Sequence, residues 1–169
     1  MADKKLHIAL LFGGNSSEHD VSKRSAHTVY DALDKDKYEV SVFMFTKDGF
    51  LLGNEDSMKI FNGAVEDEVV AEAIKDVDFS NPLANLQNLS EVKDVDLFYP
   101  VIHGNMGEDG TVQGLFRLLN KPYIGSGIAS SGVSFDKDLT KQLLTLHGIR
   151  NTKYVVVTPE TRADHPYEK

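Results

Sequence analysis

The chain has 169 residues, 41% of them hydrophobic, which suffices for one complete domain and part of another. Its apolar runs fall far short of the roughly 20 residues that cross a bilayer. A formal net charge of -8 argues against binding to nucleic acid, which is usually met by a clustered basic face. Cysteine is absent, which excludes disulfides and thiolate chemistry, and with no signal-peptide stretch we expect a cytoplasmic protein that neither enters a membrane nor binds nucleic acid.

The first third of the chain predicts a strand, a helix and a second strand. The apolar run at residues 6–12 ends at Gly13-Gly14, as a buried parallel strand does when it enters a tight turn. Apolar residues recur every three or four positions over residues 21–33, which predicts an amphipathic helix. Residues available as its N-cap are Ser16, Ser17 and Asp20. The β-forming run at residues 38–45 completes a βαβ unit.

The middle of the chain predicts less regular structure. Residues 47–53 carry a turn and a short apolar stretch, which predicts a hairpin or an edge strand. Residues 54–90 are acidic and lack a firm period, so we expect a surface excursion with one short helix near residues 67–75. A third buried strand is predicted at residues 95–102 and an amphipathic helix at residues 112–119.

The last third predicts a brief strand at residues 123–124 and a long helix at residues 134–147, with Gly148 as its C-cap glycine. Residues 153–159 predict the first strand of a new unit whose partners are not in this chain. The alternation of strands with helices predicts an α/β fold with a doubly wound, mostly parallel sheet.

Glycine-containing turns follow three of the predicted strands: Gly13-Gly14, His103-Gly104 and Gly125-Ser126-Gly127. In a parallel α/β sheet, ligands bind outside the carboxyl ends of the strands. We therefore expect the first and third strands to lie side by side and their turns to border one cleft.

The first candidate site residue is Glu18, in the turn after Gly13-Gly14. A helix that starts there presents free N–H groups and a positive dipole, and a carboxylate beside it could hold a substrate ammonium through charge-assisted hydrogen bonds. The spacing lacks the further glycines of a dinucleotide-binding fingerprint. The alternative is an ordinary capped turn, in which Glu18 only stabilises the helix dipole.

Two further candidates follow the later strands. His103 could donate a hydrogen bond to a carboxylate or phosphoryl oxygen, or could merely cap strand carbonyls. The nearby Asp109 is more typical of a helix cap. Lys137, beyond the turn at residues 125–127, could reach a nucleotide phosphate, although a lysine in this position is more often a solvated surface residue.

Read in order, the motifs GGNSSEHDVS, HGNMGEDGTVQG and PYIGSG followed by FDK resemble the D-alanine-D-alanine ligase family over essentially the whole chain. The middle motif is the most specific of the three. The resemblance implies a Rossmann-like pre-ATP-grasp substrate domain at residues 1–127, then a linking helix and the start of a truncated ATP-grasp domain at residues 128–169. It implies an enzyme that joins two D-alanines with ATP and magnesium, through an acyl phosphate, for peptidoglycan synthesis.

The resemblance also implies roles for individual residues, with Glu18 and His103 as the catalytic pair. Glu18 would hold the ammonium of the first D-alanine, with Val21 beside it at the helix start. His103 would lie near the reacting carboxyl group, and Glu108 would help to position a mobile loop from elsewhere in the enzyme. Lys137 matches a family lysine that contacts an ATP phosphate, and no metal ligand is implied in this chain.

In the family, the magnesium-binding acids, the phosphate-covering loop and the adenine pocket all match positions beyond residue 169. We therefore expect neither ligase turnover nor tight binding of ATP or magnesium by this chain alone, since such electrostatic groups supply much of an enzyme's rate acceleration. A homodimer is implied, because the family usually dimerises. Two alternatives stay open: a D-alanine-D-lactate ligase and a non-catalytic α/β binding module.

Overall fold

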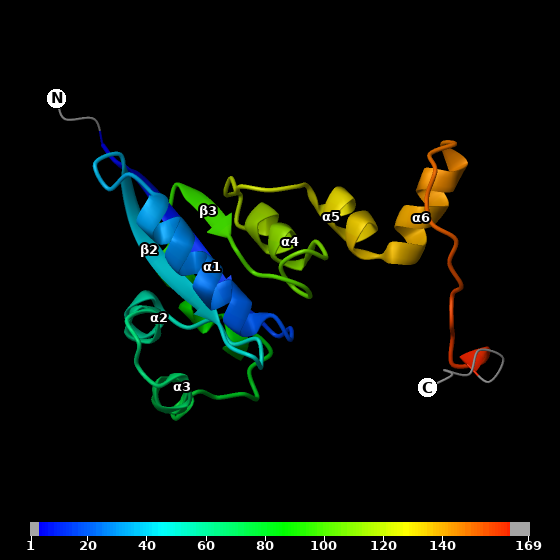
Figure 1. The fold of residues 1–169 in the computed structure, drawn as a ribbon. Helices are drawn as coiled ribbons and strands as arrows, with labels where there is room; N and C mark the ends of the chain where they lie inside the picture. Colours follow the sequence, from blue (N-terminus) through cyan, green and yellow to red (C-terminus); the bar gives the residue numbers. More distant parts are fainter. Residues whose placement is uncertain (1–3, 163–169) are drawn as a thin grey trace.

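The computed structural model describes residues 4–162, which form a molecule around a parallel three-stranded sheet (Figure 1). The strands are β1 (Leu6–Gly13), β2 (Tyr38–Phe45) and β3 (Leu97–Pro100), in the order β2-β1-β3. β1 pairs with both of the others, with Leu10 opposite Val42 on one side and opposite Tyr99 on the other. The first and third strands therefore lie side by side, as predicted.

Helices cover both faces of this sheet. The helices of residues 4–162 are α1 (His19–Ala32), α2 (Asn54–Phe61), α3 (Glu66–Ile74), the 3-10 helix η1 (Ala84–Val92), α4 (Thr111–Leu118), α5 (Ile128–Phe135) and α6 (Lys137–Leu146). Side chains alternate along β1, so Leu10 and Phe12 pack toward α1, α2 and α3, whereas Ala9 and Leu11 pack toward η1 and α4. The prediction of a doubly wound α/β fold is confirmed.

The packing of α4 positions the loop that follows β3. Phe116 of α4 stacks on Phe98 of β3 with 4.4 Å between ring centroids, and both side chains are fully buried. Stacked aromatic side chains bury a large apolar area and add a specific geometric preference. This contact holds α4, and with it the loop that carries His103, at the carboxyl end of β3.

The segment between β2 and β3 is not the surface excursion that the sequence predicted. α2 packs on the sheet through the buried side chains of Ile60 and Phe61, and Ser57 Oγ accepts a hydrogen bond from the backbone N–H of Met44 at 2.9 Å. The helix predicted near residues 67–75 is confirmed as α3. The predictions missed α2 and η1 because helices of eight or nine residues have too few turns to show a clear hydrophobic period.

The helix predicted at residues 134–147 is wrong in its start and its continuity. Two helices, α5 and α6, occupy this part of the chain, and the backbone is extended between them at Asp136. The carboxylate of Asp136 accepts hydrogen bonds from the N–H groups of Asp138 and Leu139, so it caps α6. Gly148 follows α6 in a left-handed conformation, as predicted for its C-terminal glycine.

Three short predicted strands are reduced or missing. Residues 153–159 form no strand, and Val155 within them is 64% exposed. Tyr123 makes a single parallel bridge to Phe98, and residue 51 makes a single antiparallel bridge to residue 45. A strand needs a partner for its backbone N–H and C=O groups, and none pairs with residues 153–159 within the described structure.

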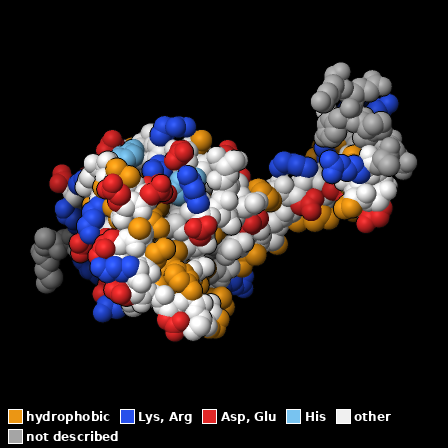
Figure 2. All heavy atoms as spheres, turned by 90° about the horizontal axis from the view of Figure 1, so that it is seen from below, with side chains coloured by type: hydrophobic (Ala, Val, Ile, Leu, Met, Phe, Trp, Pro, Cys, Tyr) orange, Lys and Arg blue, Asp and Glu red, His pale blue; other side chains and the backbone are white. Residues whose placement is uncertain are grey.

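The helices α5 and α6 lie beyond α4, away from the sheet (Figure 1). Figure 2 shows them in a narrow extension of the globular body. Acidic and basic side chains are interspersed on the surface of that body. The domain boundary at residue 127 stays a prediction. Among residues 4–162, no helix combines the length and hydrophobicity that crossing a membrane requires.

Candidate functional site

The turn after β1 requires glycine at two successive positions. Gly13 and Gly14 have φ angles of +84° and +97°, which residues with a side chain rarely adopt. A Cβ on Gly13 would lie 2.3 Å from the carbonyl oxygen of Phe45, and a Cβ on Gly14 would lie 2.7 Å from Ile102 Cγ2. The two glycines thus let β2 and the segment after β3 approach the turn closely.

Ser22 of α1 joins the ends of β1 and β3. Its buried hydroxyl accepts a hydrogen bond from the N–H of Gly13 at 2.8 Å and donates one to the carbonyl oxygen of Val101 at 2.8 Å. The sequence contained no signal for this role, because Val101 lies 79 positions away along the chain. The first turn of α1 is therefore held against both strand ends.

Glu18 occupies the N-cap position of α1, which begins without a side-chain capping bond, so the predicted caps are wrong. Ser16 instead connects two site residues: its hydroxyl accepts a hydrogen bond from the N–H of Glu18 at 3.1 Å and donates one to the carbonyl oxygen of His103 at 2.7 Å. The exposed carboxylate of Glu18 lies 3.4 Å from the position of a Cβ on Gly104. Glu18 and the His103-Gly104 turn thus meet at the carboxyl ends of β1 and β3, as predicted.

The imidazole of His103 lies between a hydroxyl and a carboxylate. Its Nε2 is 2.9 Å from Ser25 Oγ, and its Nδ1 is 3.9 Å from Glu108 Oε1. The side chains of His103 and Glu108 are 33% and 53% exposed, so solvent weakens their mutual attraction and a ligand can reach both. Because a hydroxyl can donate or accept, Ser25 is compatible with a proton on either ring nitrogen.

A cleft of about 500 Å³ brings together three of the five predicted site residues, His103, Glu108 and Lys137. Glu18 and Val21 lie outside its lining. Glu18 adjoins it through Gly104, and Val21 is 38% exposed in the first turn of α1. The cleft therefore joins the loop after β3 to the start of α6.

Lys137 presents a cation to this cleft at the first position of α6. Its ammonium donates a hydrogen bond to the carbonyl oxygen of Ser134 at 2.9 Å, and the residue is exposed. Ser126 and Ser130 line the same cleft with hydroxyl groups. An exposed lysine held by one neutral acceptor can exchange it for an anionic oxygen, so these residues fit a phosphate group.

Asp109 braces the loop between β3 and α4. Its carboxylate accepts hydrogen bonds from the N–H groups of Met106 and Thr111, each at 2.9 Å. Burial by itself would raise the pKa of Asp109, but the hydrogen bonds from Met106 and Thr111 outweigh it and hold the pKa below its ordinary value. Gly110, not Asp109, occupies the N-cap position of α4, so the predicted cap is wrong, and Asp109 instead braces the loop and the N–H of Thr111, the first residue of α4.

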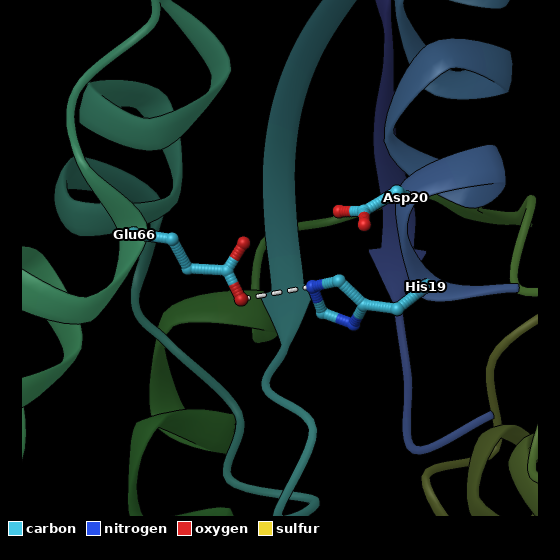
Figure 3. A group of neighbouring side chains, drawn as sticks. All are labelled: His19, Asp20 and Glu66. Atoms are coloured by element: carbon cyan, nitrogen blue, oxygen red, sulfur yellow. Dashed lines mark ion pairs between the residues drawn. The ribbon is translucent and has the colours of Figure 1, made fainter. Parts of the chain in front are cut away.

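A second polar cluster lies against the Gly13-Gly14 turn and contains His19, Asp20 and Glu66 (Figure 3). This donor set is of a type that can hold a metal ion, but Lys23 lies 2.5 Å from Glu66 and 3.9 Å from Asp20. The ammonium balances the carboxylates, so we assign the cluster no metal. The sequence did not reveal it, because Lys23 and Glu66 are 43 positions apart.

Comparisons with known proteins agree with the motifs. A family model described as the D-ala D-ala ligase N-terminus matches residues 7–126. A D-alanine-D-alanine ligase of Ligilactobacillus salivarius is 85% identical over 169 residues, which are 100% of this chain and 45% of that protein. The D-alanine-D-alanine ligase of Coxiella burnetii has a similar structure, with a TM-score of 0.72 and 32% identity over 95% of this chain and 47% of that one.

A solved structure with another acceptor in its name is also similar. The VanG D-Ala:D-Ser ligase of Enterococcus faecalis has a TM-score of 0.65 and 34% identity, over 89% of this chain and 44% of that one. The chain spans about half the length of the curated relatives it matches. The matched region contains β1, the Glu18 turn, β3 and the His103 loop, and the chain therefore belongs to the family of D-alanine-D-alanine ligase N-terminal domains.

Proposed function

We propose that this chain is the N-terminal part of a D-alanine-D-alanine ligase and that it holds the first D-alanine of the reaction. The observation that carries the proposal is the bridge through Ser16, which joins the Glu18 turn to His103. The exposed carboxylate of Glu18 and the accessible imidazole of His103 thereby lie beside the same candidate ligand site. They complement the ammonium and the carboxylate of an amino acid.

In this proposal Glu18 accepts hydrogen bonds from the ammonium of D-alanine, with Val21 beside it in the first turn of α1. His103 donates from a ring nitrogen to the carboxylate that reacts. Ser25 supports this role, because its hydroxyl can rotate to match whichever tautomer of His103 the ligand requires. Glu108, exposed at the cleft, binds a loop from elsewhere in the whole protein.

The whole protein would use ATP, which supplies the phosphoryl group that activates the carboxylate. Lys137 is the residue of this chain that we propose to contact a phosphate oxygen, and we assign no magnesium ligand to the described residues. We expect no turnover by the isolated chain, because its relatives are more than twice its length. A coupled phosphate-release assay with ATP, magnesium and D-alanine tests this, and rates typical of a complete ligase would contradict it.

D-alanine is the proposed acceptor, and the bacterial cytoplasm, where peptidoglycan precursors and ATP are available, is the proposed location. The relatives that are 85% and 71% identical are both named D-alanine-D-alanine ligases, whereas the D-Ala:D-Ser ligase is 34% identical. These names favour D-alanine over D-lactate or D-serine as the acceptor. They also favour an enzyme over a non-catalytic binding module.

We also propose that the protein forms a homodimer. In support, α4 exposes 86% of Leu118 beside a hollow of about 570 Å³ that Leu115 and Ile128 also line. Exposed apolar clusters of this kind mark contact surfaces. Light scattering should give the mass of a dimer for the native chain and for the control Leu146→Glu on α6, but that of a monomer for Leu118→Glu. A monomeric native chain would contradict the proposal.

An NMR titration of the 169-residue chain with D-alanine tests the substrate site directly. We expect the ligand to shift the amide signals of Gly14 and Gly104, and Glu18→Gln to weaken binding by about tenfold or more, since a hydrogen bond to a charged group contributes about 1.5–3 kcal/mol. Glu39→Gln is the matched control, because Glu39 is exposed and pairs with His7 at the opposite end of the strands. The proposal would be contradicted if Glu18→Gln and Glu39→Gln bound D-alanine equally well. It would also be contradicted if L-alanine bound as tightly as D-alanine but at another place.

A further inference from the structure

The buried imidazole of His19 contacts the glycine turn of the candidate substrate site. His19 is 1% exposed, and its Nδ1 lies 2.7 Å from the carbonyl oxygen of Gly14. A carbonyl oxygen can only accept, so Nδ1 is the donor. The ring also packs beneath the turn, because its Cε1 lies 3.1 Å from the position of a Cβ on Gly13.

The other ring nitrogen faces a carboxylate from a distant helix. His19 Nε2 lies 2.9 Å from Glu66 Oε1, and Figure 3 shows the two side chains reaching toward each other from α1 and α3. The oxygen lies off the direction of the ring N–H, so this contact is an ion pair when Nε2 carries a proton and not an aligned hydrogen bond. The Glu66 side chain is only 16% exposed, which limits screening by water.

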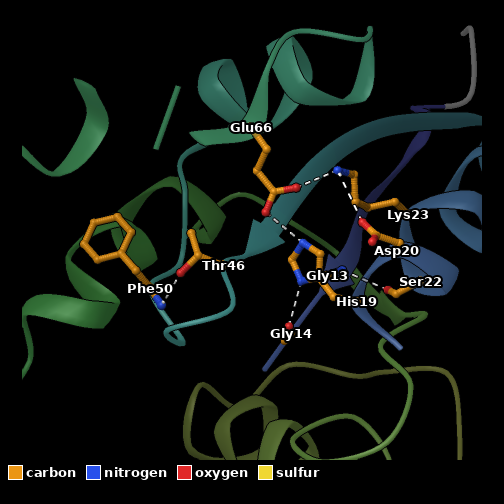
Figure 4. A network of polar contacts seen from close by, with 9 residues as sticks. All are labelled: Gly13, Gly14, His19, Asp20, Ser22, Lys23, Thr46, Phe50 and Glu66. Atoms are coloured by element: carbon orange, nitrogen blue, oxygen red, sulfur yellow. Dashed lines mark hydrogen bonds and ion pairs between the residues drawn. The ribbon is translucent and has the colours of Figure 1, made fainter. Parts of the chain in front are cut away.

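The two oxygens of Glu66 bind two different residues of α1. Oε1 contacts His19, and Oε2 accepts a hydrogen bond from Lys23 at 2.5 Å, one helical turn further on (Figure 4). α3 itself packs against α2 and the apolar cluster on that side of the sheet, through partly buried side chains that include Val69 and Ile74. The helix therefore does not depend on Glu66 for its place in the fold, and the carboxylate is available to hold the start of α1.

Glu18 lies between the two attachments of this turn. On one side of Glu18, the hydroxyl of Ser16 donates a hydrogen bond to the carbonyl oxygen of His103. On the other side, the next residue along the chain is His19 itself. A displacement of the His19 ring would move the backbone of Gly14 through the hydrogen bond and of Glu18 through the chain. The accuracy with which Glu18 faces a ligand therefore depends on the His19 ring.

We propose that Glu66 is a positioning residue for the candidate substrate site: through His19 and Lys23 it holds the Gly13-Gly14 turn and the start of α1, and thereby sets the place of the Glu18 carboxylate. The proposal rests on the proposed function, since it treats Glu18 as the group that binds the ligand. A residue of α3, outside the motifs of the sequence, would then contribute to substrate affinity without touching substrate.

The test compares three variants of the whole 169-residue chain. Glu66→Ala removes both contacts, Glu66→Gln keeps an acceptor for His19, and Glu68→Ala removes an exposed carboxylate from the same helix as a matched control. In NMR spectra we expect Glu66→Ala to shift the amide signals of Gly14 and Glu18 and to weaken D-alanine binding at least about fivefold, which corresponds to about 1 kcal/mol. Glu66→Gln should recover only a small part of this loss, because its amide keeps an acceptor oxygen but not the negative charge that faces His19 and Lys23, and Glu68→Ala should match the native chain.

A role of Glu66 in stability alone would lower the melting temperature without moving these signals or the affinity, and that result would overturn the proposal. Shifted signals with unchanged D-alanine affinity would also overturn it. If the native chain binds no D-alanine, the proposed function fails separately. The signals of Gly14 and Glu18 and the amide hydrogen exchange of Gly13 then still decide whether Glu66 holds the turn.

Discussion

Replacing Ser22 with alanine should destabilise the protein by about 2 kcal/mol. The hydroxyl satisfies the N–H of Gly13 and the carbonyl oxygen of Val101, each at 2.8 Å, and Ser22 is fully buried. A buried polar group left without a partner costs about 1–3 kcal/mol. The N–H of Gly13 is buried and should incur most of that cost, whereas the carbonyl of Val101 is partly exposed, so water can replace its partner.

Urea unfolding followed by circular dichroism measures this difference. The variant should keep the denaturant slope of the native chain and unfold at a lower midpoint, with a melting temperature lower by about 4–8 °C for a loss of 2 kcal/mol in a chain of this size. Ser130→Ala removes a hydroxyl that donates to Gly127 at an exposed position of α5, and it should change stability by less than about 0.5 kcal/mol. If Ser22→Ala costs no more than this control, the bridge between the strand ends does not stabilise the fold.

Three further changes test other parts of the reasoning. Gly104→Ala should cost about 1–3 kcal/mol in urea unfolding, because Gly104 has a φ of +72° and the new Cβ would lie 2.9 Å from Ser16 Cβ. The control Gly114→Ala should be neutral or stabilising, because a Cβ at this position of α4 would meet no atom within 4 Å. Phe116→Ala should cost about 3–5 kcal/mol by the same assay, since the ring is fully buried, and a loss under 1 kcal/mol would refute the packing described for α4. The pKa of Asp109 is lowered in the folded state, so its contribution to stability is present above the ordinary pKa of 3.8 and is lost as the pH falls below that value. Asp109→Asn should therefore flatten the fall in the free energy of unfolding across that pH range. An acid profile identical to that of the native chain would contradict this.

The elements with a long, clear pattern were predicted from the sequence. The strands at residues 6–12 and 38–45 and the helix at residues 112–119 are confirmed as β1, β2 and α4. Their apolar residues recur with the period of the element and face a single core, so the local pattern and the tertiary environment agree. The parallel arrangement and the doubly wound topology followed from the order of these elements.

The errors fall where the local pattern was weak or where a partner was decisive. α2 has only eight residues, so its buried Ile60 and Phe61 did not stand out in an acidic segment. The apolar residues around Phe135 continued a helical period, but the carboxylate of Asp136 ends one helix and caps the next. Residues 153–159 have the composition of a strand and lack a neighbouring strand among the described residues.

By itself, the sequence determined the α/β class, the glycine turns and the convergence of Glu18 with His103, because these depend on periodicity and on the geometry of parallel strands. Only the tertiary structure decided that Ser25 contacts His103 and that Glu66 contacts His19. Each of these contacts joins side chains from separate elements, and its formation depends on register, helix rotation and burial. No run of neighbouring residues encodes those three quantities, so they become visible only once the elements are packed together.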